Sequence, residues 1–98
     1  MSENKAHKAT VNRIVQRYRG EYNAQEGADI KSPFVGIVEV ETEKNVGEAP
    51  TQLQGHKGPV YIASTNKEAV DKALDTTKGT TIGVMDNKGN IVKSSTRR

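Results

Sequence analysis

Three acidic side chains in one short stretch of the sequence could assemble a metal site. In residues 36–42, Glu39 and Glu41 would share one face of a strand, while Val38 and Val40 would share the other face. The two carboxylates would stand about 7 Å apart along the strand, and Asp29 lies on the segment before it. Like charges repel unless a positive group lies between them, and a hard divalent cation takes oxygen ligands of this kind. The spacing therefore predicts a possible Mg²⁺ site.

The same spacing has a second interpretation. An edge strand can carry a solvated acidic face, whose charges discourage edge-to-edge pairing with another molecule. Short Glu-Val-Glu runs such as residues 39–41 are common in exposed strands. Spacing alone leaves both the metal site and the solvated edge strand open.

A helix of about four turns is expected before the acidic stretch, from an N-cap at Thr10 to an end near Asn23. The arginines Arg13, Arg17 and Arg19 fall mostly off its apolar face, where they either contact phosphates or cover a solvated surface. The apolar residues that recur at helical spacing are Val11, Ile14, Val15, Tyr18 and Tyr22.

Five strands and two further helices are expected after this helix. The segment 65–68 is a capping-box pattern that begins the longer helix, which Gly79 ends, and residues 86–90 form a turn. Because strands joined by helical crossovers are parallel, three strands should form a parallel core, with one antiparallel strand added at each side. The parallel strands are 36–42, 59–64 and 80–85, the antiparallel ones are 28–32 and 91–94, and the shorter helix spans 48–54.

These elements predict an α/β fold with a mixed, largely parallel sheet flanked by helices. Their order is helix, strand, strand, helix, strand, helix, strand, strand. We expect a single domain over residues 1–98, with flexible tails at 1–9 and 95–98.

This order of elements, together with three short motifs, resembles the PD-(D/E)XK nuclease superfamily, which includes restriction endonucleases and archaeal Holliday-junction resolvases. The similarity covers about residues 10–85 as topology. It implies a restriction endonuclease-like core that hydrolyses nucleic-acid phosphodiesters, in DNA rather than RNA, with Mg²⁺ or Mn²⁺ as the cofactor. The motifs are Ala28-Asp29-Ile30, residues 36–42 and Gln52-Leu53.

The resemblance also implies a set of metal ligands. Asp29 and Glu39 would be the metal-binding acidic residues, and the backbone carbonyl of Val40 would be a further ligand. Glu21 matches a place where several members of the family add another acidic residue. Gln52 would line the cleft from the following helix.

The sequence departs from the family pattern at Glu41, where the family usually has a lysine that orients the attacking water. Lys44 could reach the site from the loop, or Glu41 could act as a base or as another ligand. Lys31, Lys44 and Lys57 could hold backbone phosphates, although each is also an ordinary solvated residue.

The composition of the chain limits the size of its core and the kinds of partner that it can have. A chain of 98 residues with 33% hydrophobic residues has a modest core, which homodimerisation would enlarge. There is no cysteine and no long apolar run, so we expect a soluble, cytoplasmic protein without a membrane partner. A net charge of +3 permits a polyanionic partner but is too small to indicate one.

Three interpretations follow from the sequence. The first is a metal-dependent nuclease. The second is a catalytically degenerate nuclease-like module that binds nucleic acid or a protein partner without cleavage. The third is an interaction module in which the acidic strand is only a surface.

Overall fold

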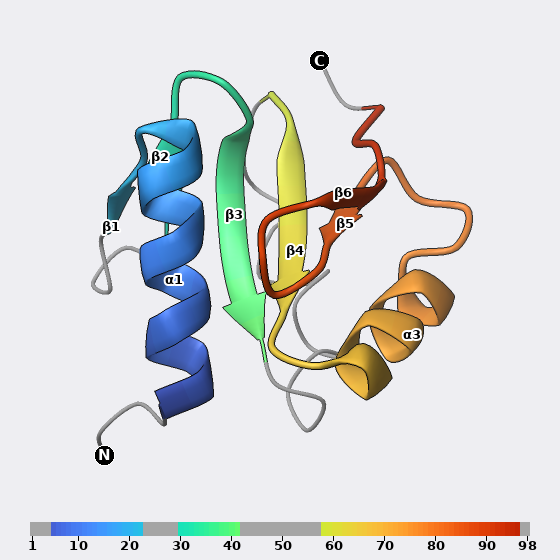
Figure 1. The fold of residues 1–98 in the computed structure, drawn as a ribbon. Coiled ribbons are helices and arrows are strands. Elements are labelled where there is room, and N and C mark those ends of the chain that lie inside the picture. Colours follow the sequence, from blue (N-terminus) through green and yellow to red (C-terminus); the bar gives the residue numbers. More distant parts are fainter. Residues whose placement is uncertain (1–4, 23–29, 42–57, 97–98) are drawn as a thin grey trace.

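The chain forms an α/β fold with one six-stranded mixed sheet and two helices (Figure 1), as a computed structural model that describes residues 5–22, 30–41 and 58–96. The predicted helix over 48–54 lies outside these residues. The elements are α1 (Lys5–Tyr18), β1 (Glu21–Tyr22), β2 (Ile30–Ser32), β3 (Gly36–Glu41), β4 (Val60–Ser64), α3 (Lys67–Thr76), β5 (Gly83–Met85) and β6 (Ile91–Lys93).

The six strands lie side by side in the order of the sequence. Strands β3, β4 and β5 are parallel to one another, and β2 and β6 pair antiparallel to β3 and β5, which confirms the predicted pairings. The sheet is less parallel than predicted, because a further antiparallel strand, β1, pairs with β2. That strand has only two residues, too few to show any periodicity.

The first helix follows its predicted apolar stripe as far as Tyr18, but it begins earlier than expected. It also ends before the predicted Asn23, so Tyr22 lies exposed on β1 and not on the helix. Val11 and Ile14 are buried, and Val15 and Tyr18 pack partly against the same core. The prediction that Thr10 is the N-cap was wrong, because α1 begins at Lys5 and the Thr10 hydroxyl donates to Ala6 O at 2.8 Å inside the helix. A threonine at this position satisfies its hydroxyl within the preceding turn, so its presence alone does not mark a helix end.

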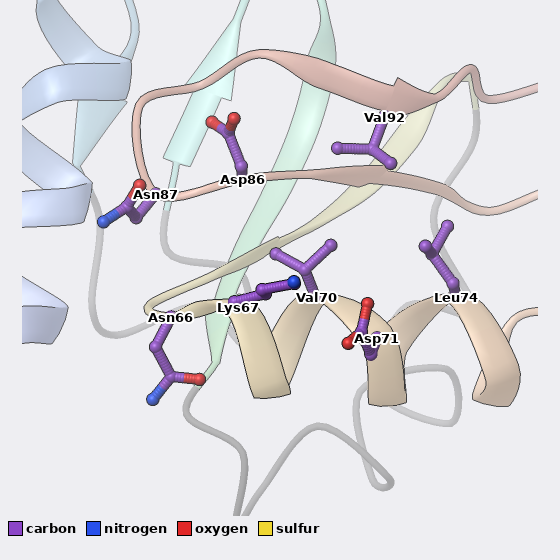
Figure 2. A pocket seen from close by; sticks show the side chains of 8 residues that line it. All are labelled: Asn66, Lys67, Val70, Asp71, Leu74, Asp86, Asn87 and Val92. Atoms are coloured by element: carbon purple, nitrogen blue, oxygen red, sulfur yellow. The ribbon is translucent and has the colours of Figure 1, made fainter.

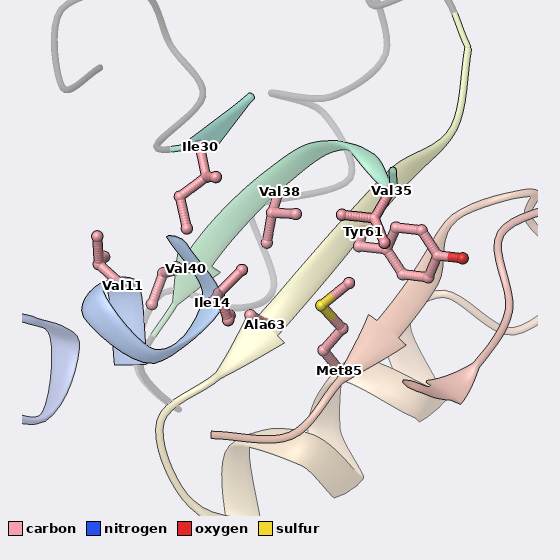
Figure 3. Packing of buried hydrophobic residues seen from close by; sticks show 9 residues of the cluster. All are labelled: Val11, Ile14, Ile30, Val35, Val38, Val40, Tyr61, Ala63 and Met85. Carbon is pink, nitrogen blue, oxygen red and sulfur yellow. The ribbon is translucent and has the colours of Figure 1, made fainter. Parts of the chain in front are cut away.

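The two helices cover opposite faces of the sheet. Side chains alternate along β3, so Val38 and Val40 pack under α1 while Ile37 packs under α3. The core on the α1 side is the larger one (Figure 3) and is formed by Val11, Ile14, Ile30, Val35, Val38, Val40, Tyr61, Ala63 and Met85. The core on the α3 side is formed by Val60, Ile62, Ala73, Ile82 and Val84.

Helix α3 begins within the predicted capping pattern. The cap is Asn66, whose side-chain oxygen accepts a hydrogen bond from the Ala69 N–H at 2.8 Å. The helix ends at Thr76, three residues before Gly79, which adopts the left-handed backbone conformation with φ +80. Both ends are therefore within a few residues of the prediction.

The turn between β5 and β6 is held against α1 by four hydrogen bonds from that helix. Arg13 and Arg17 were expected to contact phosphates or to cover a solvated surface; both are exposed, and both side chains also donate to this turn. The turn thereby ties the last strand of the sheet to the first helix. The four bonds run from Arg13 Nη1 to Asn87 O (3.3 Å), from Arg17 Nη1 to Lys88 O (3.2 Å) and to Asn90 Oδ1 (2.7 Å), and from Tyr18 OH to Gly89 O (2.5 Å).

Ordered structure reaches into both predicted tails. Helix α1 includes Lys5, and near the other end the Ser95 hydroxyl and the Thr96 N–H donate to Thr81 O at 2.9 and 3.0 Å. Within the described ranges, neither helix is long and apolar enough to cross a membrane.

Two glycines with the same backbone conformation allow a matched test of the contact between β3 and β4. Gly36 and Gly58 have φ +83 and +81, but a Cβ on Gly36 would lie 2.3 Å from Pro59 O, whereas nothing lies within 4 Å of a Cβ on Gly58. We expect Gly58→Ala to lower the free energy of unfolding by about 1 kcal/mol through backbone strain alone. Gly36→Ala should cost about 3 kcal/mol or more, because a backbone carbonyl must also move. Urea denaturation measures both, and equal losses would contradict this packing.

Candidate functional site

The two acidic residues of β3 lie on the face of the sheet that α3 covers. Glu39 and Glu41 follow Ile37 at two-residue spacing, and they lie opposite Ile62 and Ser64 of the parallel strand β4. Their side chains are only 5% and 9% exposed. The solvated edge strand is therefore ruled out, because β3 has a neighbour on each side and its acidic face is buried.

Among the described residues, the side chains that share this face with the carboxylates are mostly apolar. Val60, Ile62 and Val84 lie on the same face and are fully buried. Burying a carboxylate among such side chains is costly unless hydrogen bonds or positive charge offset the lost hydration. Two carboxylates on this face therefore require such partners, and they supply oxygen atoms that valine or isoleucine would not.

Ser64 adds a third oxygen-bearing side chain to this face. It is the last residue of β4, lies opposite Glu41, and is completely buried. Its hydroxyl has no hydrogen-bond partner within the described part of the chain, and a buried hydroxyl in that state costs about 1–3 kcal/mol. Ser64 was not among the predicted site residues, although its place at the end of an apolar strand that follows the acidic strand is a signal in the sequence.

Glu39, Glu41 and Ser64 together form the acidic patch. The patch lies toward the carboxyl ends of the parallel strands β3 and β4, the end at which open α/β sheets generally bind ligands. Two carboxylates and a hydroxyl are hard oxygen ligands of the kind that Mg²⁺ accepts. The donors suit a divalent cation or a polarised water molecule.

The other predicted site residues stand apart from this patch or outside the described ranges. Asp29, Lys44 and Gln52 belong to segments that the structure does not describe. The Val40 side chain is buried in the core under α1, which leaves only its backbone for a ligand role. Glu21 is exposed on β1 rather than at the end of the first helix. Among the described residues, no three acidic, histidine or cysteine side chains form a group that could hold a metal.

A second hollow lies between α3 and the β5–β6 hairpin (Figure 2). Its volume is about 370 Å³, and Val70, Leu74 and Val92 form its apolar part. Two carboxylates against one ammonium group make the hollow unsuitable for an anion, and the Asn66 amide is already used to cap α3. The sequence could not reveal this hollow because its residues come from separate segments. The charged and amide residues that line it are Asn66, Lys67, Asp71, Asp86 and Asn87.

Asp86 organises the turn that α1 holds. Its Oδ1 accepts from the N–H groups of Lys88 and Asn90 at 2.8 and 3.0 Å, and its Oδ2 accepts from Asn90 Nδ2 at 3.0 Å. Partial burial acts to raise the pKa of Asp86, but these hydrogen bonds and the charge of Lys88 outweigh it and lower the pKa below that of an ordinary aspartate. The ionised carboxylate therefore stabilises the turn.

Replacing Asp86 tests this role and its pH dependence. Asp86→Ala should lower the free energy of unfolding at pH 7 by about 1–2 kcal/mol, because three donors in the turn lose their acceptor. A lowered pKa in the folded state means that this stabilisation is present above about pH 4 and is lost as the pH falls through the folded-state value. Urea denaturation from pH 7 to pH 3 should thus show the two proteins converging.

Asn87→Ala in the same turn is the control, since the Asn87 backbone carbonyl that Arg13 contacts is retained. Its effect should be small and independent of pH. A difference between wild type and Asp86→Ala that stays constant down to pH 3 would contradict the assignment.

Comparison with known proteins adds no relative. No protein-family model matches the chain, and neither a curated protein nor a solved structure matches it.

Proposed function

We propose that this protein is a metal-dependent nuclease that hydrolyses phosphodiesters in nucleic acid, DNA in preference to RNA. The observation that carries the proposal is the acidic patch, where Glu39 and Glu41 are held on one buried face with the Ser64 hydroxyl beside them. Such a concentration of oxygen donors in an apolar setting fits a site that binds a hard cation.

The order and pairing of the elements also support the proposal. A helix precedes an antiparallel pair, β2 and β3, and β3 carries the Glu-x-Glu motif and pairs in parallel with β4. This agrees with the restriction endonuclease-like core that the sequence resemblance implies. In the sequence, Asp29 stands directly before β2, the place at which the resemblance puts the metal-binding aspartate.

In this proposal the ligands of Mg²⁺ or Mn²⁺ are Asp29, Glu39 and the Val40 carbonyl. The bound cation would polarise a phosphoryl oxygen and lower the pKa of a water molecule. Glu41 stands where the family usually has lysine, and here it accepts the proton of the attacking water. The Ser64 hydroxyl, opposite Glu41, holds that water in line. Lys44 and Gln52 remain predictions for the stabilisation of charge and the lining of the cleft.

A second candidate is a nuclease-like module that binds nucleic acid or a protein partner without cutting nucleic acid. The observation that favours it is Glu41, because a carboxylate cannot stabilise the negative charge that develops during hydrolysis. The fold and the acidic patch are the same in both proposals, and only an assay of cleavage separates them.

Glu39→Gln is the most direct test of nuclease activity. The substitution preserves the shape of the buried side chain but removes a charged ligand, so Mg²⁺-dependent cleavage of plasmid or branched DNA should fall by on the order of 10²-fold or more. Glu68→Gln, at an exposed carboxylate of α3, is the matched control and should cut at the wild-type rate.

Cleavage that persists in Glu39→Gln, or that needs no divalent cation, would contradict the proposed site. Salt-sensitive DNA binding by a wild-type protein that does not cut DNA would select the second candidate.

A further inference from the structure

We propose that a groove beside the acidic patch binds the backbone phosphates of the nucleic-acid strand that the patch would cut. The groove, here called the basic groove, has a volume of about 400 Å³, and Arg19, Glu21, Lys31, Gly36 and Ile37 lie along it. The inference rests on the proposed function for the identity of the ligand, but its evidence comes from other residues.

The strand pairing places Lys31 on the same face of the sheet as the carboxylates. Lys31 lies opposite Glu21 on one side and opposite Ile37 on the other. Ile37 shares its face with Glu39, two residues further along β3. Lys31 and Glu39 are therefore diagonal neighbours, and their positions on the two strands are about 7–8 Å apart. A phosphate held by the exposed Lys31 side chain is therefore one residue pair away from the acidic patch.

Arg19 is the left-handed residue that ends helix α1. Arg19 has φ +51, in the left-handed region that glycine or asparagine adopts with less strain. The conformation is imposed from both sides, because the Gly20 N–H donates to Val15 O at 3.0 Å and the Ser32 hydroxyl donates to Tyr18 O at 2.6 Å. Helices commonly end on a left-handed residue, usually glycine, and an arginine there supplies the guanidinium of the groove at some cost in backbone strain.

The charge of the groove fits a phosphodiester strand. The guanidinium of Arg19 and the ammonium of Lys31 outnumber the one carboxylate, that of Glu21. A planar guanidinium binds phosphate oxygens through two hydrogen bonds, and such contacts position the strand without reading its sequence.

The test uses the binding of fluorescein-labelled DNA, measured by anisotropy in EDTA over a range of salt concentrations so that no cleavage occurs. Arg19→Gly and Lys31→Ala should each weaken binding about 3-fold to 10-fold and reduce the slope of log K against log salt by about 1. The control Lys78→Ala removes an exposed lysine beyond the end of α3 and should change neither quantity.

Arg19→Gly also separates a role in binding from a role in folding. Glycine relieves the backbone at this position, so the melting temperature should stay the same or rise while DNA binding weakens. Glu21→Gln should tighten binding in EDTA by about 2-fold to 3-fold, because it removes the negative charge beside Lys31.

Wild-type affinity in both Arg19→Gly and Lys31→Ala, or no DNA binding by the wild type, would overturn the basic groove. The nuclease proposal fails by a different result, namely DNA binding that depends on Arg19 and Lys31 but is never followed by cleavage. Conversely, cleavage that requires Glu39 but not Arg19 or Lys31 would support the nuclease proposal and contradict the proposed role of the basic groove.

Discussion

The pairing of β3 with strands on both sides is the constraint on which the rest of this structure depends. An antiparallel neighbour, β2, and a parallel neighbour, β4, remove β3 from the edge of the sheet, so its two faces must both be covered. One face carries Val38 and Val40 under α1, while the other carries Glu39 and Glu41 on the side of α3. The same pairing brings Ser64 opposite Glu41 and Lys31 diagonal to Glu39. The proposed chemistry is thus a direct result of strand order and register.

The face of the sheet under α1 differs from the face that carries the two buried glutamates. The α1 face is filled almost entirely by aliphatic side chains, and the helix itself is fastened to the 86–90 turn by two arginines and a tyrosine. Those contacts join α1 to the turn between β5 and β6 and involve no residue of the acidic patch. Apolar packing on the α1 face helps to offset the cost of burying two carboxylates on the opposite face.

Sequence periodicity was sufficient for the elements that repeat. The alternation in residues 36–41 and the apolar segments before Ser64 and Met85 predict the three parallel strands, and the stripe through Val11 and Ile14 predicts α1. Features that depend on single contacts were not predictable in the same way. Thr10 has the side chain of an N-cap but bonds inside the helix, and β1 is too short to produce a pattern.

In the candidate site, too, some features were predictable from the spacing of residues and others depended on contacts between separate segments. The shared face of Glu39 and Glu41 follows from their spacing alone, whereas the proximity of Ser64 and Lys31 required the register of β4 and β2. The left-handed backbone of Arg19 leaves no signal in the sequence, since arginine is not the residue that this conformation favours.

The central claim, that the acidic patch binds a divalent cation, is tested most directly by titrating Mn²⁺ into the ¹⁵N-labelled protein and following the loss of amide signals. We expect the amide signals of residues 39–41 and 64–65 to broaden first, with Mg²⁺ competing for the site, and we expect the broadening to disappear in Glu39→Gln. Signals near Glu39 that persist while those of exposed acidic residues elsewhere broaden, or broadening that is unchanged in Glu39→Gln, would contradict the account.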